Sequence, residues 1–144
     1  GGPSHRTAWL EGFYKKYSLC DNADFYHMTA EEASFVKYSI NSLLAMKVTF
    51  FNQLFDVVTS TPANFNVIIK AIAADDRIGS SHTKVPGFDG KQGYGGACFP
   101  KDTSAFVNYS DKLTLLEKCI MINNEYRSQH ELNDREIEQN VNYG

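Results

Sequence analysis

The residues best suited to chemistry lie in the stretch GYGGACFPKD, at positions 93–102. It sets three glycines just before Cys98, and Lys101 and Asp102 just after it. Glycine lets a ligand come close to the backbone, and a cysteine becomes a nucleophile in an electropositive, partly open setting. Two interpretations fit these residues. One is a loop that presents Cys98 as a nucleophile, and the other is a glycine-rich loop ending in a buried structural cysteine.

The charges around Cys98 leave both interpretations open. A helix that starts near Asp102 would point its N-terminal amides back toward the loop, which favours negative charge there. Lys101 adds positive charge, but Asp102 opposes it. Cys119 falls on an apolar helical face and is interpreted as core, and Cys20 carries no signal.

A phosphate-binding role for the glycines is disfavoured. Counting from Gly93, Gly95 fits the pattern G-x-G-x-x-G, but Cys98 occupies the sixth position. Lys91 is followed by Gln92, so the P-loop ending G-K-[ST] is absent as well. A dinucleotide fold also needs βαβ strands, which this sequence does not indicate. A dinucleotide could therefore be contacted here but not principally held.

Lys37 and Asn41 form a second candidate pair. Their i, i+4 spacing places them on one face of a helix, where they interrupt an otherwise apolar run. Buried without partners, both would be costly. The pair is therefore either functional, or a lysine that reaches solvent beside an exposed asparagine.

The elements that position these residues are predicted to be mainly helical. Thr29 and Glu32 have capping-box spacing and open a helix over about 30–59, about 45 Å long and apolar enough on several faces to be central and buried. A break near Ser42 or Thr49 is the alternative. Shorter helices are expected after Ser4, Asn64 and Asp111 and near Asp102, a short strand at 23–28, and a long loop at 75–96.

Composition narrows the class of protein. The chain has 144 residues, 42% of them hydrophobic, and a formal charge of −3, which fits one soluble domain and offers no electrostatic case for nucleic acid or an anionic membrane. No apolar run is long enough to span a membrane. Three cysteines without close spacing argue against a disulfide framework or a zinc site, so we expect no metal and a reducing cytoplasm.

Four stretches together resemble a known family. EEASFVKYSINSLLAMKVTFFNQ, DDRIG, GYGGACFPKD and INNEYR occur in the order and approximate spacing of the central domain of the UDP-glucose 6-dehydrogenases, in the UDP-glucose/GDP-mannose dehydrogenase family. The resemblance implies a mainly α fold on one long buried helix, similar to the C-terminal domain of 6-phosphogluconate dehydrogenase. By the same resemblance, residues 1–28 end an NAD-binding domain, 29–130 form the helical dimerisation domain with the catalytic cysteine, and 131–144 form a polar tail expected to fray.

The family oxidises the C6 alcohol of a nucleotide sugar to a carboxylate, with two NAD molecules used in succession. By resemblance, Cys98 would be the nucleophile that carries the thioester, and Asp102 would manage protons through water. Lys37 and Asn41 would stabilise the oxyanion. Substrate contacts would come from Arg77, Lys84, Tyr94 and Gly95, and a cofactor contact from Lys101. The long helix would form a homodimer.

The sequence also departs from the family. The dinucleotide fingerprint, the NAD-binding domain with its catalytic glutamate and the C-terminal domain are not in this chain, so NAD would be held mainly elsewhere and the chain is expected to be inactive alone. Gln53 stands where many relatives carry glutamate. The alternative is a purely structural dimerisation module or a truncated remnant. A free-standing cysteine hydrolase is disfavoured, because no histidine stands in an obvious catalytic context. UDP-glucose is favoured as substrate by resemblance alone.

Overall fold

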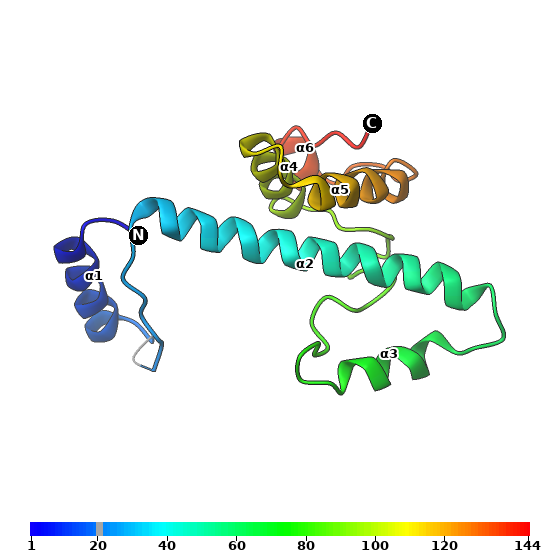
Figure 1. The fold of residues 1–144 in the computed structure, drawn as a ribbon, viewed down its shortest axis with the longest axis horizontal. Coiled ribbons are helices and arrows are strands. Elements are labelled where there is room, and N and C mark those ends of the chain that lie inside the picture. The colour runs from blue at the N-terminus through cyan, green and yellow to red at the C-terminus, as the bar shows by residue number, and fades with distance from the viewer. Residues whose placement is uncertain (20–21) are drawn as a thin grey trace. The chain divides into compact units, whose positions relative to one another are not determined.

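The computed structural model describes residues 1–19 and 22–144 (Figure 1), which leaves Cys20 outside the described residues. Throughout those two ranges the chain forms helices and irregular segments without a strand, which confirms the mainly α prediction. Contacts divide it into two compact units, Gly1–Ser39 and Ile40–Gly144. The helices are α1 (Ser4–Tyr17), α2 (Ala30–Thr59), α3 (Phe65–Ala73), α4 (Phe99–Tyr109), α5 (Thr114–Arg127) and α6 (Asp134–Glu138).

The first unit contains α1 and an irregular segment. Along α1 the ring of Phe13 packs against Trp9 and Tyr17, with centroids 5.6 and 5.1 Å apart. Pro3, not Ser4, occupies the N-cap, and no side chain caps the helix. The strand predicted at 23–28 is wrong, because a strand requires a paired neighbour and the described residues supply none.

Helix α2 is continuous, so the alternative with a break near Ser42 or Thr49 is wrong. Both residues are buried inside the helix, and the Thr49 hydroxyl donates to the Ala45 carbonyl at 3.1 Å. The capping box forms as predicted. The Glu32 amide donates to Thr29 Oγ1 at 3.2 Å, and the Thr29 amide donates to Glu32 Oε2 at 2.7 Å.

Within the second unit, α2 has buried side chains on two sides and exposed apolar side chains on a third. Ser42, Ala45, Thr49 and Asn52 share one buried side, which is built from small or polar residues, and Phe51 and Val58 share the other. The exposed side carries Leu43, Phe50 and Val57.

The core of the second unit joins α2, α5 and the glycine-rich loop. Ala45, Tyr94 and Cys119 form a buried cluster, and the Cys119 thiol donates to Thr49 Oγ1 at 3.2 Å. In the view of Figure 1, α4, α5 and α6 lie above this part of α2, and α3 lies below it. Asn64 caps α3 as predicted, by accepting a bond from the Asn66 amide at 2.9 Å.

The C-terminal residues do not fray, contrary to the prediction. They form α6, and Asn133 and Glu136 close a capping box at its start. Glu136 and Tyr143 are buried, at 0% and 7% exposure. The polar groups of this segment can be buried because they are hydrogen-bonded to one another and to α5. Polarity is therefore a poor guide to disorder here. None of the helices in the described part of the chain has the length and apolar character needed to cross a membrane.

Candidate active site

Cys98 lies at the N-terminal end of α4 and is exposed. Its carbonyl accepts a hydrogen bond from the Asp102 amide at 2.9 Å, which is the first backbone hydrogen bond of the helix. Pro100 falls in the first turn, where a missing N–H costs the helix nothing. The start of α4 at Phe99 lies three residues before the predicted position. This exposure excludes the interpretation of Cys98 as a buried structural cysteine.

One turn beyond Cys98, the Asp102 carboxylate is completely buried. It accepts a hydrogen bond from Asn41 Nδ2 at 2.6 Å and pairs with Lys101 Nζ at 2.5 Å. A buried carboxylate needs such partners. The structure therefore brings together three of the predicted site residues, from α2 and α4. Asn41 Nδ2 carries a second N–H besides the one directed at Asp102.

Lys37 also belongs to α2, but to the part of it in the first unit. Its ammonium group lies 5.4 Å from the centroid of the Tyr38 ring. Its assignment to the oxyanion stays a prediction.

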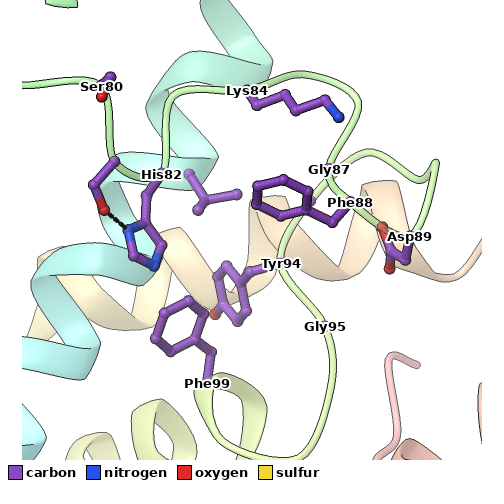
Figure 2. A pocket seen from close by; sticks show the side chains of 12 residues that line it. Ser80, His82, Lys84, Gly87, Phe88, Asp89, Tyr94, Gly95 and Phe99 are labelled. Atoms are coloured by element: carbon purple, nitrogen blue, oxygen red, sulfur yellow. Dashed lines mark hydrogen bonds between the residues drawn. The ribbon is translucent and has the colours of Figure 1, made fainter.

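A cavity of about 590 Å³ lies beside the loop that leads to Cys98 (Figure 2). It brings together three of the four predicted substrate-binding residues, which are Lys84, Tyr94 and Gly95. Figure 2 shows the rings of Tyr94 and Phe99 near the ring of His82, with Lys84 and Phe88 above them. The lining residues are Val48, Ser80, Ser81, His82, Lys84, Gly87, Phe88, Asp89, Gly93, Tyr94, Gly95 and Phe99.

Aromatic rings, the Lys84 cation and the Asp89 carboxylate, which is paired with Arg127, line this cavity. The Lys84 ammonium lies 4.8 Å from the centroid of the Phe88 ring. The Tyr94 hydroxyl is 3.5 Å from Thr103 Oγ1, and burial raises the pKa of Tyr94 above its ordinary value. Such a lining suits a ligand with a flat ring and negatively charged groups.

His82 is a lining residue that the sequence reasoning missed. Its ring lies 5.6 Å from that of Phe99, and its Nδ1 is hydrogen-bonded to the Ser81 hydroxyl. The available signal was its position in the long loop between DDRIG and GYGGACFPKD. The four histidines are scattered along the chain, so their spacing indicates no shared site.

Arg77 is not among the residues that line the cavity. Its side chain is 88% exposed and pairs with Asp75, with Nη2 2.6 Å from Oδ2. The hydrogen bond from Arg77 lowers the pKa of Asp75. The predicted substrate contact of Arg77 therefore stays a prediction.

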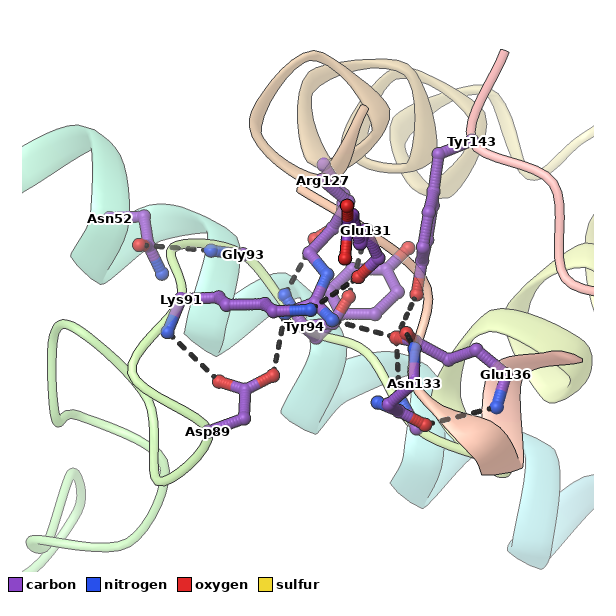
Figure 3. Close-up of polar contacts among 12 residues, drawn as sticks. Asn52, Asp89, Lys91, Gly93, Tyr94, Arg127, Glu131, Asn133, Glu136 and Tyr143 are labelled. Atoms are coloured by element: carbon purple, nitrogen blue, oxygen red, sulfur yellow. Dashed lines mark hydrogen bonds and ion pairs between the residues drawn. The ribbon is translucent and has the colours of Figure 1, made fainter. Parts of the chain in front are cut away.

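Asparagines on two helices fix the first half of the glycine-rich loop. The Gly93 amide donates to Asn52 Oδ1 at 3.1 Å (Figure 3). The Tyr94 amide donates to Asn123 Oδ1 at 2.7 Å, and Asn123 Nδ2 donates back to the Tyr94 carbonyl at 3.1 Å. Gly93 has a φ of 76°, which favours glycine. The loop is thus held by α2 and α5.

A buried ion pair lies under the same loop. Arg127 Nη2 is 2.7 Å from Glu136 Oε1, and both side chains are at most 1% exposed. Arg127 Nη1 also pairs with Asp89 at 2.7 Å. Burial by itself raises the pKa of Glu136, but hydrogen bonds from the Asn133 backbone, Tyr143 and Gly96, and the charge of Arg127, lower it to about 2. The sequence reasoning used Arg127 only as part of INNEYR and gave Glu136 no role.

No cluster of three or more potential metal ligands occurs in residues 1–19 or 22–144.

Comparison with known proteins assigns the class to which this fold and site belong. The model of the UDP-glucose/GDP-mannose dehydrogenase family, central domain, matches residues 31–125. The chain therefore belongs to the UDP-glucose/GDP-mannose dehydrogenase family, as its resemblance predicted.

Individual relatives agree with this assignment. A UDP-glucose 6-dehydrogenase of Campylobacter jejuni is 40% identical over 109 residues, which cover 75% of this chain and 26% of that protein. UDP-glucose 6-dehydrogenase YwqF of Bacillus subtilis is 34% identical over 133 residues, covering 89% of this chain and 28% of the relative. The chain thus spans about a quarter of the length of these curated relatives.

The two described cysteines should differ in reactivity. Cys98 is exposed, whereas Cys119 is 6% exposed, and burial raises its pKa against the hydrogen bond with Thr49. Under native conditions we expect iodoacetamide to modify Cys98 at least about tenfold faster than Cys119. Peptide mass spectrometry of timed samples measures this. Modification of Cys119 before Cys98 would contradict the site, and the unfolded chain, in which the rates should converge, is the control.

Acid should weaken the fold through Glu136. Its pKa is about 2 in the folded protein against an ordinary value of 4.5, so its contribution is complete above about pH 4.5 and is lost as the pH falls toward 2. Urea unfolding from pH 6 to 2.5 should show a shallower decline in Glu136→Gln, which also loses about 3 kcal/mol at neutral pH.

The matched control is Glu138→Gln, an exposed position on the same helix. It should keep the wild-type slope, because Glu138 is not part of the buried ion pair. Other groups, such as Asp89, contribute to the decline in wild type and in both variants. An identical slope for Glu136→Gln and wild type would show that Glu136 does not titrate in this way.

Proposed function

We propose that this chain is the central domain of an NAD-dependent UDP-glucose 6-dehydrogenase and supplies its nucleophile. The observation that carries the proposal is the placement of an exposed Cys98 one turn before the buried Asp102, inside the segment that matches the family. The names of the relatives support UDP-glucose as the substrate.

In the proposed reaction Cys98 acts on the aldehyde formed by the first oxidation at C6. The sulfur forms a bond to C6, and the carbonyl oxygen takes up the C=O electron pair and the thiol proton to give a thiohemiacetal. NAD, when bound, would supply the hydride acceptor for both oxidations, and oxidation of the thiohemiacetal would leave a thioester on Cys98. Water then adds to the thioester, the C–S bond breaks, and the sugar carboxylate leaves with the thiol regenerated.

Residues around Cys98 stabilise the charges of these steps. Asn41 holds Asp102 with one amide N–H, and its second N–H can donate to the oxyanion together with Lys37. Fixed donors of this kind account for large rate effects in acyl chemistry. Asp102 accepts and returns the proton of the hydrolytic water. These roles agree with the predicted ones.

The cavity beside the loop receives part of the nucleotide sugar in this proposal. Lys84 supplies a cation for a phosphate group, and Tyr94 and Gly95 border the sugar. Arg77, being exposed, reaches the substrate from outside the cavity. Because a dinucleotide is held by βαβ strands, which the described residues lack, we assign NAD one contact here, with the half-exposed Lys101.

A second candidate function is dimerisation through α2. Leu43, Phe50 and Val57 are 64%, 58% and 63% exposed. Their seven-residue spacing aligns them along one helix face, and an exposed apolar row of this kind is typical of a protein interface. We propose that the same row of a second copy covers it, whether or not the chain also takes part in catalysis.

Activity should require more than this chain. Purified alone, it should form no NADH from UDP-glucose and NAD. Placed in the Campylobacter jejuni relative in exchange for the matching segment, the whole chain, residues 1–144, should support NADH formation. In that chimera Cys98→Ser should lower turnover about a thousandfold or more, because the nucleophile is lost.

The matched control is Cys119→Ala in the same chimera, which should remain active. Circular dichroism of each variant distinguishes lost chemistry from lost folding. A folded Cys98→Ser chimera with unchanged turnover would refute the nucleophile and favour a structural role.

The dimer predicts a concentration-dependent mass. Sedimentation of the wild-type chain at micromolar concentration should give two copies, and Phe50→Glu should give one, since it places a charge in the centre of the apolar row. Val67→Glu, at a 64% exposed position on α3, is the control and should remain dimeric. A monomeric wild-type chain, or a dimeric Phe50→Glu variant, would count against this interface.

A further inference from the structure

The segment after α5 contacts the loop that carries Cys98, and the proposed chemistry does not use that contact. Gly96 lies two residues before Cys98, and its amide donates to Glu136 Oε1 at 3.0 Å. The same oxygen accepts bonds from Arg127 Nη2 and the Tyr143 hydroxyl, each at 2.7 Å. Glu136 is completely buried, so water does not compete for these bonds.

The loop also lies directly against the ion pair. A Cβ atom at Gly95 would come 2.3 Å from Glu136 Oε1 and 2.4 Å from Arg127 Nη2, well inside contact distance. The peptide backbone at 95 and 96 therefore rests on the two charged groups. A shift of the Glu136 carboxylate would move this part of the loop with it.

The two halves of the loop have different anchors. Asn52 and Asn123 hold Gly93 and Tyr94 from α2 and α5. Glu136 holds Gly96, on the side of the loop that leads to Cys98. Gly96 has a φ of 79° and open space where a Cβ would be, so side-chain packing does not fix it. Its position depends on the hydrogen bond to Glu136.

We propose that Glu136 and Tyr143 are positioning residues for Cys98, an inference that gains catalytic meaning from the proposed function. Glu136 fixes the Gly96 amide, and Tyr143 holds the carboxylate in the orientation that does so. The C-terminal segment is then part of the active-site framework. Misplacing a reacting group by about 1 Å can cost about a hundredfold in rate, so this bond is important for a nucleophile two residues away.

Amide hydrogen exchange of the intact chain, followed residue by residue by NMR, tests this directly. In Glu136→Ala the Gly96 amide should be accelerated about tenfold more than the Tyr94 amide, each relative to its own rate in wild type, as expected for the loss of one buried hydrogen bond. The Tyr94 amide, held by Asn123, reports the general loss of stability. Glu136→Gln keeps an acceptor oxygen and should restore part of the Gly96 protection.

Two further variants sharpen the test. Glu138→Ala, an exposed change on the same helix, should leave both amides unchanged. Tyr143→Phe keeps the ring but removes one hydrogen-bond donor to Glu136, and it replaces Glu136→Ala in the test if that variant fails to fold. In Tyr143→Phe the Gly96 amide should exchange about threefold faster, and the Tyr94 amide should exchange at the wild-type rate. Equal acceleration of Gly96 and Tyr94, or no acceleration of Gly96, would overturn the positioning role and leave a general effect on stability.

This outcome is separable from that of the proposed function. Cys98→Ser should leave Gly96 exchange at the wild-type rate, because the sulfur is not part of the anchor. If the Gly96 amide exchanges faster in Glu136→Ala but the chimera is active without Cys98, the positioning role stands and the thioester is refuted. If Gly96 exchange is unchanged but the chimera requires Cys98, the thioester stands and the positioning role is refuted.

Discussion

The second unit is organised around the buried pair of Arg127 and Glu136. Two charges removed from water are tolerated only when nearly every polar atom finds a partner, and here the partners come from separate parts of the chain. Asp89 approaches from the long loop and Tyr143 from the C-terminal segment. The pair is therefore complete only when α5, the long loop and the C-terminal segment are all in place.

Helix α2 serves two sides of the molecule at once. On its buried side, Asn41 reaches Asp102, Ala45 packs under Tyr94, and Asn52 holds Gly93. On its exposed side a row of apolar residues remains uncovered within one chain. If that row binds a second copy as proposed, assembly would stiffen the helix on which the loop before Cys98 rests.

Local patterns in the sequence predicted most of the helices. The capping box at Thr29 and the long apolar run identified α2 to within a residue, and the cap at Asn64 identified α3, because these signals act between neighbours in the chain. The grouping of Lys84, Tyr94 and Gly95 as substrate-binding residues came from family resemblance, since residue types alone did not bring them together, and the structure places all three around one cavity.

What the sequence did not reveal depends on contacts between distant residues. Glu136 and Tyr143 lie in a polar stretch that composition classes as a loose tail, yet both are buried. Their partners, Arg127 and Gly96, are 9 and 40 positions from Glu136. His82 was missed for the same reason, because only the folded loop brings its ring against Phe99.

The glycines of the GYGGACFPKD loop show that a sequence signature can preserve two kinds of information. Gly93 and Gly95 are small because Asn123, Arg127 and Glu136 occupy the space where side chains would be, and these reasons hold whether or not a thiol reacts nearby. A variant of this chain without Cys98 would still need both glycines, as long as it kept the ion pair. Within this motif, Cys98 bears on the proposed chemistry, whereas Gly93 and Gly95 are required by the architecture beneath it.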